Sequence, residues 1–170
     1  MLIYFHWTPE LITVTGPPGG EPLREPPNVV INGDGKITGL GQDAEAAARA
    51  PGMQLMRFPD VATAWEHQRL ASALLRYYWM TMEFRDRSNW WAFAAQLWPR
   101  LHSCVVIHPA EGAERGLGEE QATWLRGAFR YPQRTFVWRG ARLDRAARLA
   151  DADHRGQWMG GHAPKVKRGI

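Results

Sequence analysis

The strongest constraint on the fold is a change in the hydrophobic pattern after about residue 40. Before that point, short runs of β-branched and apolar residues are separated by turn-forming Gly, Pro, Asn and Asp. After it, helical and strand patterns alternate, an order that makes successive strands parallel and their crossovers right-handed. Together the two patterns predict an α/β fold, in which helices flank a mixed five-stranded sheet.

The expected elements follow from these local patterns. The predicted strands span residues 2–7, 11–15, 28–31, 36–40, 103–107 and 135–138. The predicted helices span residues 43–49, 61–82, 89–98, 119–129 and 142–150. Asp43 and Asp60 stand where an N-cap is expected. Apolar residues at three- and four-residue steps give the 61–82 helix one face to bury. Residues 53–58 are consistent with an extended segment.

The length of 170 residues suits one domain. We expect a single α/β domain over residues 1–153 and a basic, flexible tail over 154–170. No apolar run approaches the roughly 20 residues that a transmembrane helix needs. The first residues soon meet Pro9 and lack the basic start of a signal peptide. Cys104, the single cysteine, lies in an apolar run, which indicates a buried structural thiol and fits a reducing compartment. The expected location is therefore the cytoplasm.

The net charge of +4 is concentrated toward the end of the chain. The residues responsible include Arg139, Arg142, Arg145, Arg148, Lys165, Lys167 and Arg168. Such a basic end binds nucleic acid or acidic lipid in some proteins. Without a recognition motif it is more typical of a solvated helix face followed by a loose tail.

No motif for catalysis, metal binding or cofactor binding is recognisable. Glycine-rich phosphate loops of the Walker and dinucleotide-binding types are absent. The histidines lack the spacing of metal ligands; they are His6, His67, His102, His108, His154 and His162. Ser88 and Ser103 lack the context of a nucleophile. The carboxylates have structural explanations, Asp144 as a cap and Glu119 with Glu120 as the start of a helix. We therefore expect no catalytic residue, no metal and no cofactor.

Five stretches, in this order, resemble the first lobe of the actin-like superfamily, and most closely that of the MreB, or rod-shape, bacterial actins. They are Glu10–Gly16, Leu23–Ile31, Gly35–Ala44, Ala71–Tyr78 and Val105–Pro109. The resemblance covers about residues 2–150 and implies a sheet of the ribonuclease-H-like type, as in actin subdomain I.

The chain departs from that family where the resemblance would place ATP. Tyr4, His6 and Trp7 stand where the family has the small and acidic residues of a phosphate loop. Residues 139–141 replace an acidic residue followed by proline near the attacking water. The resemblance also includes no second lobe. These departures imply a non-catalytic relative without a nucleotide cofactor.

The expected function is that of a protein-interaction module in a cytoskeletal, cell-shape or membrane-associated assembly. The resemblance places the interaction surface at the interlobe face; its candidate residues are Trp7, Pro9, His108, Trp138 and Arg139. We expect the tail, a partner protein or a second copy of the chain to cover this face, unless Trp7 and Trp138 are ordinary core residues. Two alternatives remain: a nucleic-acid-binding protein that uses the basic C-terminal region, and a ribonuclease-H-like enzyme, although the first strand lacks the carboxylates that such an enzyme needs.

Overall fold

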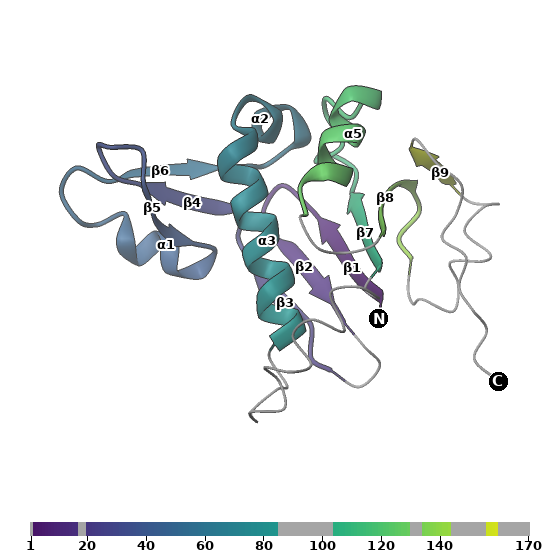
Figure 1. The fold of residues 1–170 in the computed structure, drawn as a ribbon, viewed down its shortest axis with the longest axis horizontal. Helices are drawn as coiled ribbons and strands as arrows, with labels where there is room; N and C mark the ends of the chain where they lie inside the picture. Colours follow the sequence, from purple (N-terminus) through teal and green to yellow (C-terminus); the bar gives the residue numbers. More distant parts are fainter. Residues whose placement is uncertain (1, 17–19, 85–103, 130–133, 144–155, 160–170) are drawn as a thin grey trace.

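The computed structural model describes residues 2–16, 20–84, 104–129, 134–143 and 156–159 (Figure 1). The strands are β1 (Leu2–Trp7), β2 (Ile12–Thr15), β3 (Leu23–Glu25), β4 (Asn28–Ile31), β5 (Ile37–Leu40), β6 (Gln54–Arg57), β7 (Cys104–Pro109), β8 (Arg134–Gly140) and β9 (Gly156–Met159). The helices are α1 (Gln42–Ala47), α2 (Val61–Glu66), α3 (Gln68–Phe84) and α5 (Glu119–Gly127). The helix expected at 89–98 and most of that at 142–150 lie outside the described residues.

The main sheet has the strand order β3-β2-β1-β7-β8-β9. Strands β1, β7 and β8 are mutually parallel, whereas β2, β3 and β9 run antiparallel to their neighbours. The mixed α/β fold is thus confirmed, and β3-β2-β1-β7-β8 has the strand arrangement of a ribonuclease-H-like lobe. The expected count of five strands is wrong by one, and the membership also differs. Strands β3 and β9 were not predicted, whereas the predicted strands at 28–31 and 36–40 belong to a second sheet.

Strand β9 also corrects the prediction of a flexible tail. Residues 156–159 were expected to be loose, yet they form a ladder with β8 in which Trp158 lies opposite Trp138. The expectation is wrong for these four residues, because the backbone groups of β8 were available for pairing and no local signal in the sequence marks that opportunity. The remainder of the tail lies outside the described residues.

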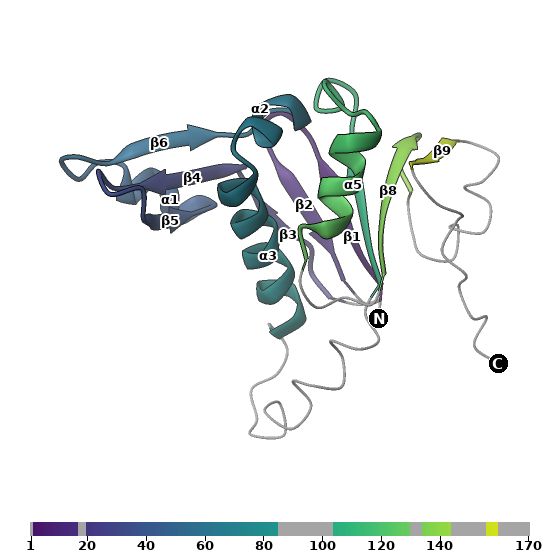
Figure 2. The same cartoon turned by 45° about the horizontal axis from the view of Figure 1, so that its top comes forward.

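A second sheet, with the order β5-β4-β6, projects from the body as a small lobe (Figures 1 and 2). The predicted opening meander is therefore divided between two sheets. The division falls at Pro26 and Pro27, which lack the N–H that a ladder needs. Helix α1 packs on the lobe at Gly39, where a Cβ would come within 2.9 Å of the Ala47 Cβ. The extended segment expected at 53–58 is confirmed as β6.

The larger hydrophobic cluster lies between the main sheet and the helices α2, α3 and α5, and a separate smaller cluster contains Val106, Trp138 and Leu143. Strand β1 alternates strictly: Ile3, Phe5 and Trp7 are buried, and the residues between them are only partly so. The apolar stripe of α3 supplies Leu74, Leu75 and Trp79 to the same cluster, among others. Among the described residues, no helix is long and apolar enough to cross a membrane.

Two helix predictions require correction. The expected 61–82 helix is broken at His67, whose backbone leaves the helical region (φ −125°, ψ 45°). No Gly or Pro marks this break, so local sequence could not have located it. The expected cap Asp43 lies in the first turn of α1, and Gly41 occupies the N-cap position. The carboxylate of Glu25, on β3, accepts a hydrogen bond from the Gln42 N–H (3.2 Å) and so takes over the role of the cap.

Candidate functional site: the surface at the carboxyl ends of the central strands

The parallel strands β1, β7 and β8 bring the sequence-predicted residues to one edge of the sheet. His6 lies opposite His108 and Trp7 opposite Pro109 in the β1–β7 register. The Ala110 N–H donates to the Trp7 carbonyl oxygen (2.7 Å), which continues the β1–β7 pairing to the end of β7. Because parallel strands end together, binding sites in α/β proteins are commonly found at such an edge. We call the residues at this edge, from 6–9, 108–110 and 139–143, the strand-end surface.

A hydrogen-bond network supports this surface from beneath. The Nε2 of His108 lies 2.8 Å from the Gly140 carbonyl oxygen, which can only accept, so Nε2 carries the proton. The Nδ1 of His108 is then an acceptor, and Tyr4 donates its hydroxyl proton to it (2.5 Å). The Leu143 N–H in turn donates to the Tyr4 oxygen (3.3 Å). The network therefore joins β1 and β7 to the segment that follows β8.

Both histidines of the site are uncharged at neutral pH. Burial is the main cause that lowers the pKa of His108 to about 4; the neighbouring His6 and Arg142 act in the same direction, and the hydrogen bond to Gly140 opposes them. Burial, followed by the charge of Arg142, also lowers the pKa of His6. The positive charge of the strand-end surface thus comes from the exposed Arg139 and Arg142.

The tryptophans expected as candidate interaction residues are core residues. Trp7 is 1% exposed and donates its indole N–H to the Phe58 carbonyl oxygen (3.0 Å). Trp138 is fully buried and donates to the Ala141 carbonyl oxygen (2.9 Å). Its ring packs against that of Trp158 on β9, with 4.7 Å between the ring centroids. Both residues therefore follow the alternative that the sequence left open, namely ordinary core residues, because each ring faces apolar neighbours and its only polar atom is satisfied internally. For Trp138, one of these neighbours, Trp158, belongs to the predicted tail.

The other candidates differ in exposure. His108 is 2% exposed and Pro9 is partly buried. Arg139 is exposed and pairs with Glu114 through its Nε (3.3 Å), which links β8 to the loop between β7 and α5. The structure therefore brings all five candidate interaction residues to one edge of the sheet, but leaves only Pro9 and Arg139 in contact with solvent.

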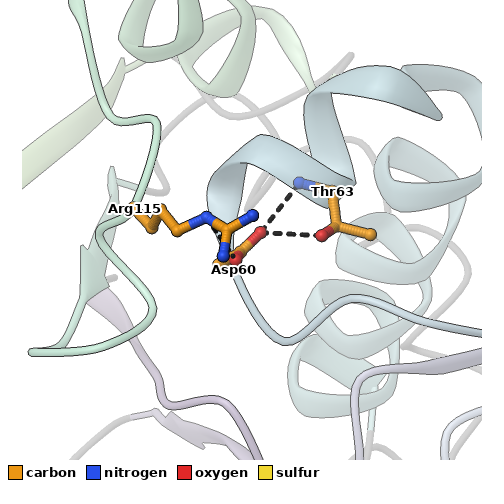
Figure 3. Close-up of polar contacts among 3 residues, drawn as sticks. All are labelled: Asp60, Thr63 and Arg115. Atoms are coloured by element: carbon orange, nitrogen blue, oxygen red, sulfur yellow. Dashed lines mark hydrogen bonds and ion pairs between the residues drawn. The ribbon is translucent and has the colours of Figure 1, made fainter.

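A carboxylate beside the site has a structural role. Asp60 caps α2: its Oδ1 accepts from both the N–H and the hydroxyl of Thr63, each at 2.8 Å, and its Oδ2 pairs with the Arg115 Nε at 3.4 Å (Figure 3). The loop that carries Arg115 is tied to α2 by hydrogen bonds from the N–H groups of Val61 and Ala62 to the carbonyl oxygens of Ala113 and Arg115. The predicted capping role of Asp60 is confirmed.

Neither a metal-ligand cluster nor an activated thiol is found among the described residues. No three His, Cys, Asp or Glu side chains among them are grouped so as to hold a metal ion. Burial raises the pKa of the Cys104 thiol to about 11, so the thiol is not a ready nucleophile. Other residues considered in the sequence, namely Ser88, His102, Ser103, Asp144, His154 and His162, lie outside the described part of the chain.

Sequence reasoning missed the Tyr4–His108–Gly140 network and the segment that it holds. Tyr4 and His108 are 104 residues apart, and only the β1–β7 pairing brings them together. The one usable signal was Gly140, which adopts a φ of 139° that other residues rarely take.

Comparison with known proteins assigns no family to the chain. No family model matches it, and no curated protein matches it. One solved structure that it resembles is that of MreB5 of Spiroplasma citri bound to ADP, with 11% sequence identity and a TM-score of 0.45. That match covers 80% of this chain and 37% of the MreB5 chain. A likeness this weak transfers neither family nor ligand, so the strand-end surface has to be interpreted from its own geometry.

Proposed function

We propose that this chain is a non-catalytic protein-interaction module of the actin-lobe type, and that it binds an acidic surface of a partner protein through the strand-end surface. The proposal keeps the function expected from the sequence but changes the contact residues. Buried aromatic side chains support the surface from beneath, and arginines make the contact. An assembly of the cytoskeletal, cell-shape or membrane-associated kind is the setting that the sequence resemblance implies.

The observation that carries the proposal is the construction of residues 140–143, which we call the pinned segment. Three hydrogen bonds hold its backbone from below: His108 Nε2 to the Gly140 oxygen, Trp138 Nε1 to the Ala141 oxygen, and the Leu143 N–H to the Tyr4 oxygen. Gly140, Ala141 and Arg142 are nevertheless exposed. A surface segment of fixed shape loses little conformational entropy when a partner binds.

The chemistry of the pinned segment favours an acidic protein partner. Arg142 and the neighbouring Arg139 present guanidinium groups, which bind carboxylates in a bidentate geometry and are enriched at the centres of protein interfaces. The neutral state of His6 and His108 leaves these two arginines as the cations of the surface. Arg142 is the better probe of the pair, since Arg139 already contacts Glu114.

The test compares charge reversal at the two ends of β8. Arg142→Glu reverses a charge in the pinned segment, whereas Arg134→Glu reverses an exposed charge at the start of the strand. Each of the three forms is immobilised on beads and incubated with native extract from the source organism. The proteins that the beads retain are then quantified by mass spectrometry. We expect a specific partner to be retained by the wild type and by Arg134→Glu but lost with Arg142→Glu.

Two results would contradict the proposal. One is a set of retained proteins that is identical for all three forms. The other is binding of DNA or RNA that depends on Arg142 and falls steeply with salt, which would favour the nucleic-acid alternative instead.

A further inference from the structure

The small lobe ends in a strand whose outer edge is open. Strand β4 is the middle strand of the β5-β4-β6 sheet, so β6 has a neighbour on one side only. No described helix or strand lies along its other side in either Figure 1 or Figure 2. Gln54 and Arg57 are exposed, while Leu55 and Met56 between them are half-buried. A strand at the open edge of a sheet presents unpaired backbone N–H and C=O groups.

The hydrogen-bond pattern identifies which backbone groups face outward. The Phe58 N–H donates to the Pro27 oxygen (2.9 Å), just beyond the regular register that pairs Asn28 with Arg57. In an antiparallel ladder the residues alternate between hydrogen-bonded and non-hydrogen-bonded pairs. Met56 and Gln54 therefore point their N–H and C=O groups toward β4, and Leu55 and Arg57 point theirs away from it. The outer edge of β6 thus offers regularly spaced donors and acceptors.

Two other edge strands, β3 and β5, are blunted more strongly than β6. Strand β3 has only three residues and runs into Pro26 and Pro27. Strand β5 pairs with β4 through an irregular register and contains Gly39. Strand β6 pairs without a bulge and contains no proline, lysine or glycine. Natural proteins use such features to prevent edge-to-edge pairing. Strand β6 is itself short, carries Arg57 and is followed by Pro59, but its regular ladder with β4 makes it better suited than β3 or β5 to a further strand of a few residues.

We propose that the outer edge of β6 binds the β6 edge of a second copy of this chain, so that two lobes form one continuous antiparallel sheet. This is a contact separate from the strand-end surface. A two-fold axis at Leu55 lets Leu55 of each copy exchange two backbone hydrogen bonds with its counterpart. The Arg57 N–H then donates to the Met53 oxygen of the other copy, and the two arginines lie at opposite ends of the contact.

Charge favours a second copy over a charged partner at this edge. Residues 28–57 contain three acidic side chains, Asp34, Asp43 and Glu45, and three basic ones, Lys36, Arg49 and Arg57. The lobe is therefore electrically neutral, and the net charge of +4 resides in the rest of the chain. Two lobes can approach without net repulsion, and surfaces of near-zero charge associate most readily. Because the edge is only four residues long, we expect a weak dimer.

The test measures self-association by analytical ultracentrifugation and amide hydrogen exchange by NMR over a range of protein concentrations. We expect the Leu55 and Arg57 amides to gain protection as the dimer forms, while the Met56 amide is protected at every concentration. Leu55→Pro removes an outward donor without removing a bond to β4, and Leu55→Lys places two like charges together at the two-fold axis. Each should raise the dimer dissociation constant by at least about tenfold, since both reciprocal bonds are affected.

Thr38→Lys is the matched control, since it adds the same charge at an exposed position of β5, and it should leave the dimer intact. Leu55→Lys also keeps the test decisive if Leu55→Pro fails to fold. A chain that stays monomeric at its highest soluble concentration would overturn the proposal, as would a dimer that survives Leu55→Lys. A dimer abolished by Arg142→Glu but not by Leu55→Lys would assign self-association to the strand-end surface instead.

Discussion

At the scale of single residues, Gly41 shows how a backbone conformation joins two parts of the molecule. It adopts φ 58° and ψ −129°, a combination that L side chains rarely take, and its N–H donates to the Asn28 oxygen. A Cβ at this position would collide with the carboxylate of Glu25 and come within 3.1 Å of the Tyr78 ring. Glu25 is itself half-buried, and burial raises the pKa of its carboxyl group. Gly41 is therefore part of the joint between body and lobe.

We predict that Gly41→Ala lowers the free energy of unfolding by about 1–3 kcal/mol, because strain and the displacement of Glu25 add together. Chemical denaturation measures the effect. Gly33→Ala is the matched control, since Gly33 lies in an exposed turn and a Cβ there has no neighbour within 4 Å. Equal stabilities of the two variants would show that the joint tolerates a side chain.

A second residue-scale prediction concerns His108 and pH. Its folded-state pKa of about 4 lies below the ordinary value of 6.5, so the unfolded chain binds the proton more tightly. Stability is then fully present above about pH 6.5 and is lost as the pH falls toward 4, by up to about 3 kcal/mol. His108→Gln, whose amide can both donate and accept, should flatten the pH dependence of the denaturation midpoint in this window.

The control for this prediction is His67→Gln, which changes an exposed histidine at the junction of α2 and α3. It should keep the slope of the wild type. If both variants lose the slope equally, or if neither does, the pH dependence does not originate at His108.

At the scale of elements, Asp60 at the start of α2 makes two kinds of interaction: buried capping hydrogen bonds and an ion pair with an exposed arginine. Asp60 is 9% exposed at its side chain and satisfies Thr63 twice, whereas the Arg115 side chain that pairs with it is 78% exposed (Figure 3). A solvated arginine gains little from a single carboxylate. The capping hydrogen bonds, rather than the charge pair, should therefore dominate the contribution of Asp60.

We predict that Asp60→Ala costs about 1–2 kcal/mol of stability, because α2 loses its cap. Arg115→Ala should cost less than about 0.5 kcal/mol, and Asp60→Asn should stay near the wild type, since asparagine caps as well as aspartate does. Thermal unfolding of the three variants ranks the two effects. A larger loss for Arg115→Ala than for Asp60→Ala would reverse the assignment.

At the scale of the whole molecule, two surfaces face different directions. The strand-end surface lies at the carboxyl ends of β1, β7 and β8, and the open edge of β6 lies on the lobe, on the other side of helix α3 (Figure 1). A module that binds a partner at one surface and a second copy at the other could bring two partners together without any catalytic chemistry. The two contacts are independent, so each can be tested without the other.

The non-catalytic part of the proposal predicts that the chain does not bind ATP with magnesium. Trp7 fills the core beneath the β1–β2 turn, and the Thr8 hydroxyl is occupied by the oxygen (2.8 Å) and the N–H (3.1 Å) of Leu11. Calorimetric titration should show no heat beyond dilution, and the unfolding temperature should not rise with added nucleotide. Saturable heat accompanied by thermal stabilisation would contradict the prediction.

Elements whose signals are local can be predicted from the amino-acid sequence alone. The alternation of β1, the cap at Asp60, the turn after β4 and the start of α5 at Glu119 all follow from side-chain pattern and backbone preference within a few residues. The mixed α/β class follows from their order, because right-handed crossovers leave few topologies. These inferences needed no knowledge of what each segment touches.

Features that depend on distant partners become visible only in the folded chain. Glu25 caps α1 by bonding Gln42, 17 residues away in the sequence, and β9 pairs with the edge of β8. His108 joins Tyr4 to Gly140. The same holds for Trp7 and Trp138, whose burial depends on which face of the sheet is covered. The type of a side chain limits the bonds it can make, but the fold determines which partners come within reach. The candidate site consists almost entirely of contacts between residues that are distant in the sequence.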